Sequence, residues 1–145
     1  MSPNNPQKEL SVILVAEDDP DDRFLIEQAF RTGGFSNRLF FVEDGVELLD
    51  YLFGREQYAA NGSTRPGCLL LDLKMPRMDG REALQAIRQN PEYADMPILI
   101  LSTSDSENDK QYCTELGVYD YVTKPDNFAG LLALADKAKT VCCPG

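Results

Sequence analysis

The sequence predicts an α/β fold, with a doubly wound sheet of five parallel strands. Short and wholly apolar runs, such as Leu69-Leu70-Leu71, recur along the chain. Runs of this length without polar alternation are typical of strands that are covered on both faces. Each run is followed by a segment in which apolar residues have helical spacing. The alternation of strands with helices therefore indicates a parallel (βα)5 sheet with helices on both faces.

The predicted strands and helices alternate from the N-terminal region onward. Strands are expected at residues 12–16, 39–42, 68–72, 98–101 and 119–123. Helices are expected around residues 24–29, 46–52, 82–89, 106–116 and 131–138. Several helix ends carry residues that stop or cap helices: Gly33-Gly34 stops the first helix, Asp44 caps the second, and Gly117 ends the fourth.

A single domain is expected, because 145 residues suit one compact core and the chain shows no internal repeat. Residues 1–9 are expected to form a flexible leader, residues 10–141 the domain and residues 142–145 a tail. A longer polar loop is expected at residues 54–67, which contain several turn-forming residues.

Charge and hydropathy argue against two classes of partner. The chain has 24 acidic and 14 basic side chains and a formal net charge of −10, so nucleic acid would be repelled at long range. No run approaches the roughly 18 apolar residues of a membrane span, and the polar N-terminal segment does not resemble a signal peptide. We therefore expect a cytoplasmic protein that binds neither nucleic acid nor membranes.

The chain contains no histidine, which excludes imidazole-based acid–base catalysis and a role as a phosphohistidine donor. Its cysteines, Cys68, Cys113, Cys142 and Cys143, lack the spacing of metal ligands. A redox role is not expected for them. Chemistry must therefore depend on carboxylates, hydroxyl groups and lysine.

Polar residues follow four of the predicted strands, at the points where the strands end. These residues are Glu17 and Asp18 after the first strand, Asp72 after the third, Ser102 after the fourth and Lys124 after the fifth. Because the carboxyl ends of parallel strands share one edge of the sheet, we expect these side chains to share a crevice. Clustered carboxylates repel each other or take up protons unless a cation joins them. Mg²⁺ is the natural cation, because it prefers oxygen ligands.

That cluster suits phosphoryl transfer, since three carboxylates, Mg²⁺ and one lysine together carry no net formal charge. Asp72 could attack phosphorus as a carboxylate nucleophile, while Mg²⁺ and Lys124 neutralise charge on the transferring oxygens. Ser102 could donate a hydrogen bond to a phosphoryl oxygen and draw its loop inward.

Four further acidic residues lie near these strand ends, and each has a structural explanation. Asp19, Asp21 and Asp22 are expected to be solvated or to cap the first helix, where negative charge is favourable. Asp79 precedes Gly80 and is expected to hold that turn. None of the four is predicted to bind the metal.

These motifs resemble those of a two-component response-regulator receiver domain. They are Val12 to Asp19, Leu71-Asp72-Leu73-Lys74-Met75-Pro76 with Met78-Asp79-Gly80, Ile98 to Thr103, and Tyr121 to Pro125. The resemblance covers residues 11 to about 140. It implies the flavodoxin-like fold of CheY-like receivers.

The resemblance implies a phosphorylation site at Asp72, which matches the phosphoacceptor. Asp18 and Asp72 match direct ligands of Mg²⁺, and the main-chain carbonyl of Lys74 matches a third protein ligand. Glu17 matches the other acid of the pocket, which reaches the metal through water.

The resemblance also implies a conformational switch. Ser102 matches the switch hydroxyl, and Tyr121 matches the aromatic residue that turns inward. Lys124 matches the lysine that contacts phosphate. Pro125 matches the proline of a cis Lys-Pro bond, which is an uncommon isomer.

Three alternatives remain open from the sequence. A degenerate receiver could act as a phosphorylation-independent protein-binding scaffold. A phosphatase of the haloacid dehalogenase type would need an acid two residues after its nucleophile, where this chain has Lys74. A flavodoxin-like cofactor carrier would need a Ser/Thr/Gly-rich phosphate loop after the first strand, where Glu17-Asp18-Asp19 would repel phosphate.

Other segments resemble the small regulators that are paired with bacterial phytochrome kinases. They are Arg23-Phe24-Leu25-Ile26, Val42 to Glu47, and Tyr51-Leu52. The resemblance implies a light-sensing histidine kinase as phosphohistidine donor, and a homodimer formed through the fifth strand and last helix. A chemotaxis-type or phosphorelay receiver is the competing interpretation. In either case the chain would catalyse only its own phosphorylation and dephosphorylation, and would signal through contacts with a downstream protein that the sequence does not identify.

Overall fold

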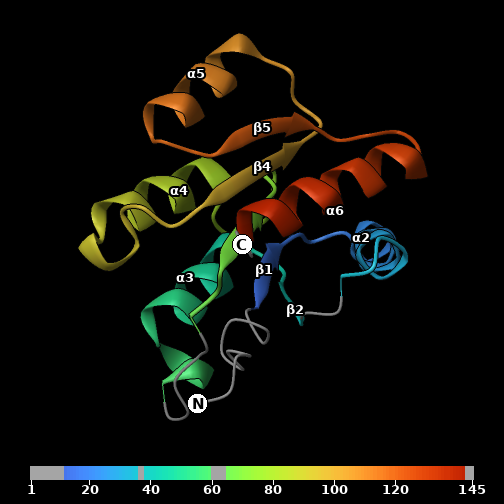
Figure 1. Cartoon of the computed structure of the whole chain (residues 1–145). Coiled ribbons are helices and arrows are strands. Elements are labelled where there is room, and N and C mark those ends of the chain that lie inside the picture. Colours follow the sequence, from blue (N-terminus) through green and yellow to red (C-terminus); the bar gives the residue numbers. More distant parts are fainter. Residues whose placement is uncertain (1–11, 36–37, 60–64, 143–145) are drawn as a thin grey trace, which may run out of the picture.

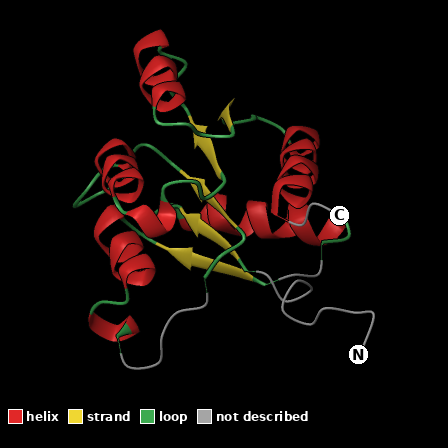
Figure 2. Ribbon diagram, turned by 60° about the vertical axis from the view of Figure 1, so that its left-hand side comes forward, coloured by secondary structure: helices red, strands yellow, loops and turns green. Residues whose placement is uncertain are grey.

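The structure, a computed structural model, describes residues 12–35, 38–59 and 65–142. Five parallel strands form one sheet in the order β2-β1-β3-β4-β5 (Figures 1 and 2). The strands are β1 (Ile13–Ala16), β2 (Leu39–Val42), β3 (Cys68–Leu71), β4 (Ile98–Ser102) and β5 (Asp120–Thr123). The predicted five-stranded parallel sheet is therefore confirmed.

A helix follows each strand, as predicted. The helices are α2 (Pro20–Thr32), α3 (Gly45–Phe53), α4 (Gly80–Gln89), α5 (Glu107–Glu115) and α6 (Phe128–Cys142). Short 3₁₀ helices lie at Glu56–Tyr58 and Pro91–Tyr93. Helices α2 and α6 pack together over one face of the sheet, whereas α3, α4 and α5 lie over the other (Figure 1). This arrangement confirms the doubly wound architecture.

The core consists of two apolar layers, one on each face of the sheet. Every residue of β1, β3 and β4 is buried, which explains why these strands have continuous apolar sequences. One layer includes Leu69 and Leu71 with apolar side chains of α3 and α4, and the other includes Leu70 with those of α2 and α6. Because these three strands are parallel neighbours, the polar residues at their carboxyl ends come together at one edge of the sheet.

Aspartate side chains cap α2, α3 and α4, which begin at this edge. Asp19 accepts hydrogen bonds from the backbone N–H groups of Asp21 and Asp22 at the start of α2. Asp44 caps α3, as predicted, and Asp79 caps α4. The expected role of Asp79 in the turn before α4 is therefore confirmed.

Some expected segments lie outside the described residues or differ from the expectation. The leader at residues 1–9 and the final residues 143–145 are not described. Cys142, expected at the start of the tail, is the last residue of α6. The predicted polar loop contains the 3₁₀ turn Glu56–Tyr58. Within the described ranges, no helix combines the length and apolar character needed to cross a bilayer.

Candidate functional site

Glu17 and Asp72 lie side by side because β1 and β3 are neighbours in the sheet. Ala16 and Leu71 are paired in the register of these strands, and each acid directly follows one of them. The backbone N–H of Asp72 donates to the carbonyl oxygen of Ala16 over 3.1 Å. Glu17 is 1% exposed and Asp72 is 5% exposed, so both carboxylates have lost most of their contact with water.

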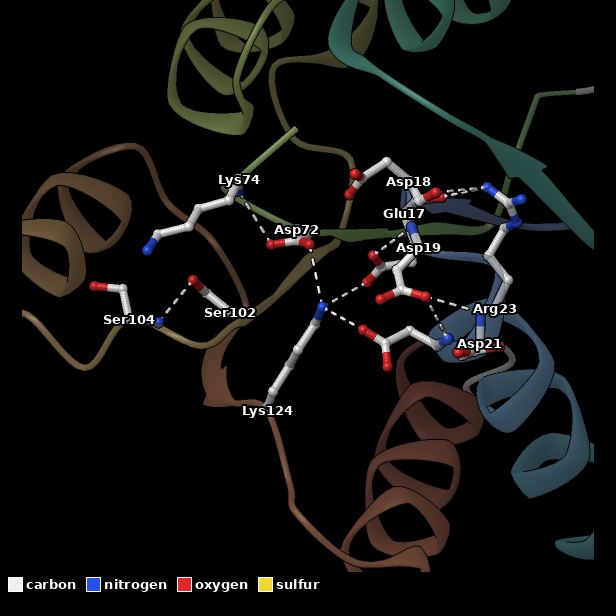
Figure 3. Close-up of polar contacts among 11 residues, drawn as sticks. Glu17, Asp18, Asp19, Asp21, Arg23, Asp72, Lys74, Ser102, Ser104 and Lys124 are labelled. Atoms are coloured by element: carbon white, nitrogen blue, oxygen red, sulfur yellow. Dashed lines mark hydrogen bonds and ion pairs between the residues drawn. The ribbon is translucent and has the colours of Figure 1, made fainter. Parts of the chain in front are cut away.

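Asp18 completes a group of three carboxylates. One oxygen atom from each of Glu17, Asp18 and Asp72 lies within 4.8 Å of the other two. Asp18 is exposed, whereas the other two acids are buried. Arg23 fixes the turn that carries these acids, because its guanidinium donates to the carbonyl oxygens of Glu17 and Asp18 over 3.0 and 3.3 Å (Figure 3). The predicted crevice therefore contains its three acidic residues.

Lys124 enters the crevice from the end of β5 (Figure 3). Its ammonium nitrogen lies 2.8 Å from Glu17 Oε1 and 3.2 Å from Asp72 Oδ2. A third carboxylate oxygen, Asp22 Oδ2, lies 2.8 Å away. The Lys124 side chain is 16% exposed, and the ammonium therefore replaces part of the hydration that the buried acids have lost.

Burial changes the acidity of the groups in this crevice. It raises the pKa of Glu17 to about 7, although the Lys124 ammonium opposes this shift. Burial also raises the pKa of Asp72, against the stabilising effect of the Lys74 backbone N–H, which donates to Asp72 Oδ1 over 3.1 Å, and of Lys124. For Lys124 itself, burial acts to lower the pKa, but hydrogen bonds to Asp22 and Glu17 outweigh it and the net pKa is raised. The crevice therefore holds more negative charge than its own lysine compensates.

The donor set fits a divalent cation. Mg²⁺ and Mn²⁺ prefer oxygen ligands, and the three carboxylates supply such ligands where burial disfavours uncompensated negative charge. A shallow depression bordered by Asp18, Lys74 and Asp79 opens beside this cluster, so solvent reaches it. In the described part of the chain, the carboxylates expected at a cation site are thus already assembled.

Ser102 and Tyr121 lie on the side of Asp72 that is away from the acids. Ser102 is fully buried, and its hydroxyl oxygen accepts a hydrogen bond from the Ser104 backbone N–H over 3.1 Å (Figure 3). The half-buried Tyr121 donates its hydroxyl proton to the carbonyl oxygen of Ser104 over 2.7 Å. The two predicted switch residues therefore meet at one residue of the loop after β4.

The expected cis bond between Lys124 and Pro125 is wrong, because every peptide bond in the described ranges is trans. The trans isomer is the preferred form of an X–Pro bond. In this form the backbone N–H of Lys124 donates to the carbonyl oxygen of Ser102 over 2.7 Å. The trans bond thus accompanies a direct continuation of the β4–β5 pairing to the site lysine.

Sequence reasoning missed two contacts at this edge. Asp22 was expected to be solvated or to cap α2, but it pairs with Lys124. The sequence gives no local signal for this pair, because its two residues are 102 positions apart. The second missed contact is the bidentate pair between Arg77 and Asp44, with nitrogen–oxygen distances of 2.9 and 3.1 Å. No local pattern in the sequence indicates this pair.

Comparison with known proteins decides the family. Residues 13–136 match the response regulator receiver domain. The chain belongs to the response regulator receiver family. This assignment agrees with the sheet order, the helices on both faces and the polar residues at the carboxyl edge.

Phytochrome response regulators are among its relatives. Response regulator Rcp1 of Synechocystis is 36% identical over 131 residues, which are 90% of this chain and 86% of that protein. The crystal structure of the phosphorylated cyanobacterial phytochrome response regulator RcpA is 33% identical, with a TM-score of 0.81, and the match covers 90% of this chain and 91% of that one. The bacteriophytochrome response regulator RtBRR is 38% identical, with a TM-score of 0.76 and coverage of 88% and 77%. The chain is thus a receiver homologous to phytochrome-associated regulators.

Proposed function

We propose that this receiver accepts a phosphoryl group on Asp72 from the phosphohistidine of a sensor histidine kinase, in a Mg²⁺-dependent reaction. The observation that carries the proposal is the contact of Asp72 with Lys124 inside a cluster of three carboxylates. A phosphoryl group at Asp72 would lie beside an ammonium group and beside the ligands of a divalent cation. An ammonium group and a divalent cation both stabilise negative charge on the oxygens of a phosphoryl group during its transfer.

In the proposed reaction, a carboxylate oxygen of Asp72 attacks phosphorus. The bond between phosphorus and the donor's imidazole nitrogen breaks, and that nitrogen keeps the electron pair. Asp72 then carries an acyl phosphate, and its hydrolysis returns the carboxylate and inorganic phosphate. Lys124 orients and neutralises the phosphoryl oxygens, and Ser102 donates a hydrogen bond to one of them.

We assign the cation to the side chains of Glu17, Asp18 and Asp72 and to the main-chain carbonyl of Lys74. A bound Mg²⁺ would supply positive charge next to the phosphoryl oxygens. The raised pKa of Glu17 and Asp72 supports this assignment, since both record negative charge that burial leaves poorly compensated. Mn²⁺ is bound in a crystal structure of response regulator Rcp1, which is 33% identical to this chain, with a TM-score of 0.82.

The alternative of a phosphatase has no comparable support. The residue two positions after Asp72 is Lys74, whose side chain is exposed and is no general acid or base of the carboxylate type. We therefore expect the chain to catalyse only its own phosphorylation and dephosphorylation, and to signal through protein contacts in the cytoplasm.

Partners are inferred from the relatives. Several are regulators of phytochromes or of red light signaling, and this supports a light-sensing histidine kinase as donor. A homodimer through β5 and α6 remains part of the proposal, supported by the exposed Tyr119 just before β5. A solution mass that stays monomeric across a wide range of protein concentrations would contradict the dimer.

The test is phosphorylation by acetyl phosphate or by a cognate kinase, with and without Mg²⁺. Intact-protein mass spectrometry should show the gain of one phosphoryl group in the wild type only when Mg²⁺ is present. The Asp72→Asn variant should gain none under the same conditions. A wild-type protein that takes up no phosphoryl group from either donor would favour the scaffold alternative.

A further inference from the structure

Lys124 contacts one carboxylate that does not belong to the proposed cation cluster. Its ammonium nitrogen lies 2.8 Å from Glu17, 2.8 Å from Asp22 and 3.2 Å from Asp72. Glu17 and Asp72 belong to the cluster that could hold a cation, together with Asp18. Asp22 comes from the first turn of α2 and is the additional partner.

The ammonium group donates hydrogen bonds to Asp22 and Asp72 and forms an ion pair with Glu17. An ammonium group has three protons and no acceptor, and three carboxylates surround it. A phosphoryl oxygen on Asp72 that binds Lys124 therefore competes with these carboxylates for the ammonium group.

Asp22 is the partner that gives way at the smallest cost. The side chain of Glu17 is 1% exposed and that of Asp72 is 7% exposed, whereas that of Asp22 is 36% exposed. Water can solvate the Asp22 carboxylate when it leaves the lysine, but cannot readily solvate the other two. Asp72 would itself carry the phosphoryl group.

We propose that Asp22 is a positioning residue that holds the Lys124 ammonium at the mouth of the crevice and competes for it with a phosphoryl oxygen. The inference rests on the proposed function. Asp22 keeps its whole charge for Lys124 when a cation is bound, whereas Glu17 and Asp72 then share theirs with the cation. Removal of the Asp22 charge should therefore strengthen binding of a phosphoryl group.

Asp21 provides a matched control. It is the preceding residue on the same helical turn, carries the same charge, and has an exposed side chain. Its backbone N–H donates to the cap Asp19, so an asparagine side chain leaves that bond in place. Asp21→Asn thus reproduces the change in net charge of Asp22→Asn, while Lys124 keeps its described partners.

The first measurement is the affinity for beryllofluoride, a mimic of the phosphoryl group, in the presence of Mg²⁺. Asp22→Asn should bind it about fivefold more tightly than wild type, the equivalent of one partly exposed ion pair. The acetyl phosphate concentration that gives half the maximal phosphorylation rate should fall by a similar factor, with the maximal rate changed less than about twofold. Asp21→Asn should stay within about twofold of wild type in both measurements, and Asp22→Glu, which retains a carboxylate, should restore wild-type values.

A second measurement needs neither cation nor phosphoryl group. In the metal-free protein, nitrogen-15 NMR of the Lys124 ammonium should show faster proton exchange with water in Asp22→Asn than in Asp21→Asn. Equal exchange in the two variants, or beryllofluoride affinity that is equal in both or weaker in Asp22→Asn, would overturn the role of Asp22. Cation-dependent phosphorylation of the wild type would still support the proposed function in that case. A wild type that takes up no phosphoryl group would instead refute the proposed function, and the competition for Lys124 with it.

Discussion

The two loops that border Asp72 are built in different ways. The loop between β3 and α4 (residues 72–79) is fixed by buried side chains, close backbone contacts and an ion pair. The loop between β4 and α5 (residues 103–106) is held mainly by hydroxyl groups. The β3–α4 side of the crevice is thus rigid, while the β4–α5 side can rearrange at small energetic cost.

Core packing and a long-range ion pair anchor the β3–α4 loop. Leu73 and Met75 are buried within the apolar layer beneath α3 and α4. Arg77, whose φ angle of +64° lies in the left-handed region, reaches Asp44 at the start of α3 with two hydrogen bonds. A non-glycine residue at such an angle persists only where its surroundings hold it. Asp72 and Lys74 are therefore presented on a rigid support.

The β4–α5 loop has no comparable anchor among its described side chains. Thr103, Asp105 and Ser106 are exposed. Ser104 donates its hydroxyl proton to Asp109 over 2.7 Å and accepts a bond at its carbonyl oxygen from Tyr121. Hydrogen bonds at a solvent-exposed loop are readily exchanged for bonds to water. A new acceptor at Asp72 could therefore draw this loop inward without disturbing the core.

Gly80→Ala should have the largest effect, because it disrupts the fixed loop directly. A Cβ atom at this position would lie 2.4 Å from the carbonyl oxygen of Asp72 and 2.7 Å from Leu73 Cα. We expect a loss of about 3 kcal/mol in the free energy of unfolding, since backbone atoms cannot move aside cheaply. Urea denaturation provides the measurement.

Gly117→Ala is the matched control. Gly117 has a φ angle of +71°, and a Cβ atom there would meet no atom within 4 Å. Its cost should be about 1 kcal/mol, from backbone strain alone. If both alanine variants lost the same free energy of unfolding, the close packing of the β3–α4 loop against Gly80 would not explain why this loop is rigid.

Asp44→Ala should have the next largest effect. Its carboxylate accepts from the Glu47 backbone N–H over 2.8 Å as the cap of α3 and also binds Arg77. We expect the free energy of unfolding to fall by about 2 kcal/mol, because α3 loses its N-cap and Arg77 loses its charged partner. Asp50→Ala, which removes a longer contact of 3.4 Å to the exposed Arg55, should cost about 0.5 kcal/mol. Equal losses of free energy in the two variants would show that the Arg77–Asp44 pair does not stabilise the β3–α4 loop.

The pH dependence of stability should single out the charge of Asp44. Burial acts to raise the pKa of Asp44, but the hydrogen bonds from Arg77 and from the Glu47 backbone outweigh it, and the net pKa lies below the ordinary value of 3.8. The unfolded chain therefore takes up this proton first as the pH falls. The stabilisation of the folded state by the ionised Asp44 carboxylate is fully present above about pH 4 to 5. It is lost as the pH falls through the pKa of Asp44 in the folded state.

Asp44→Asn isolates this effect, because asparagine also caps helices but carries no charge. Unfolding free energies of wild type and variant, measured between pH 7 and pH 3, should differ at pH 7 and converge at the acid end. A difference that stays constant over this range would mean that the charge of Asp44 does not stabilise the loop.

Local patterns explain why most of the fold and the acidic cluster could be predicted. Leu69-Leu70-Leu71 followed by Asp72 is visible in four consecutive residues, and the geometry of a parallel sheet then brings Glu17 beside Asp72. The same shared edge brings Lys124 to the crevice from the end of the fifth predicted strand. Short-range hydrophobic periodicity therefore carried the prediction.

The contacts that could not be predicted depend on how helices, strands and loops that are distant in the sequence pack against each other. Asp22 and Lys124 are 102 residues apart, and Asp44 and Arg77 are 33 apart. Their pairing follows from the tilt of α2 and from the path of the β3–α4 loop, which no local pattern specifies. The prediction of a cis Lys124–Pro125 bond was wrong for a related reason. The energy difference between the two isomers is small, so the surrounding structure decides which one forms.

Tyr121→Phe should have a small effect on global stability and the most local effect on dynamics. The half-buried hydroxyl donates a hydrogen bond to the Ser104 carbonyl oxygen, and the loss of this bond should cost about 0.5–1 kcal/mol. The amide proton of Ser104 should exchange with solvent several-fold faster, because the loop opens more often. The amide of Gly80, which donates to the Leu73 carbonyl oxygen over 2.8 Å, should keep its wild-type protection from hydrogen exchange in the same sample. Equal acceleration at both amides would mean that the two loops open together, and the contrast between a rigid and a movable side of the crevice would then be wrong.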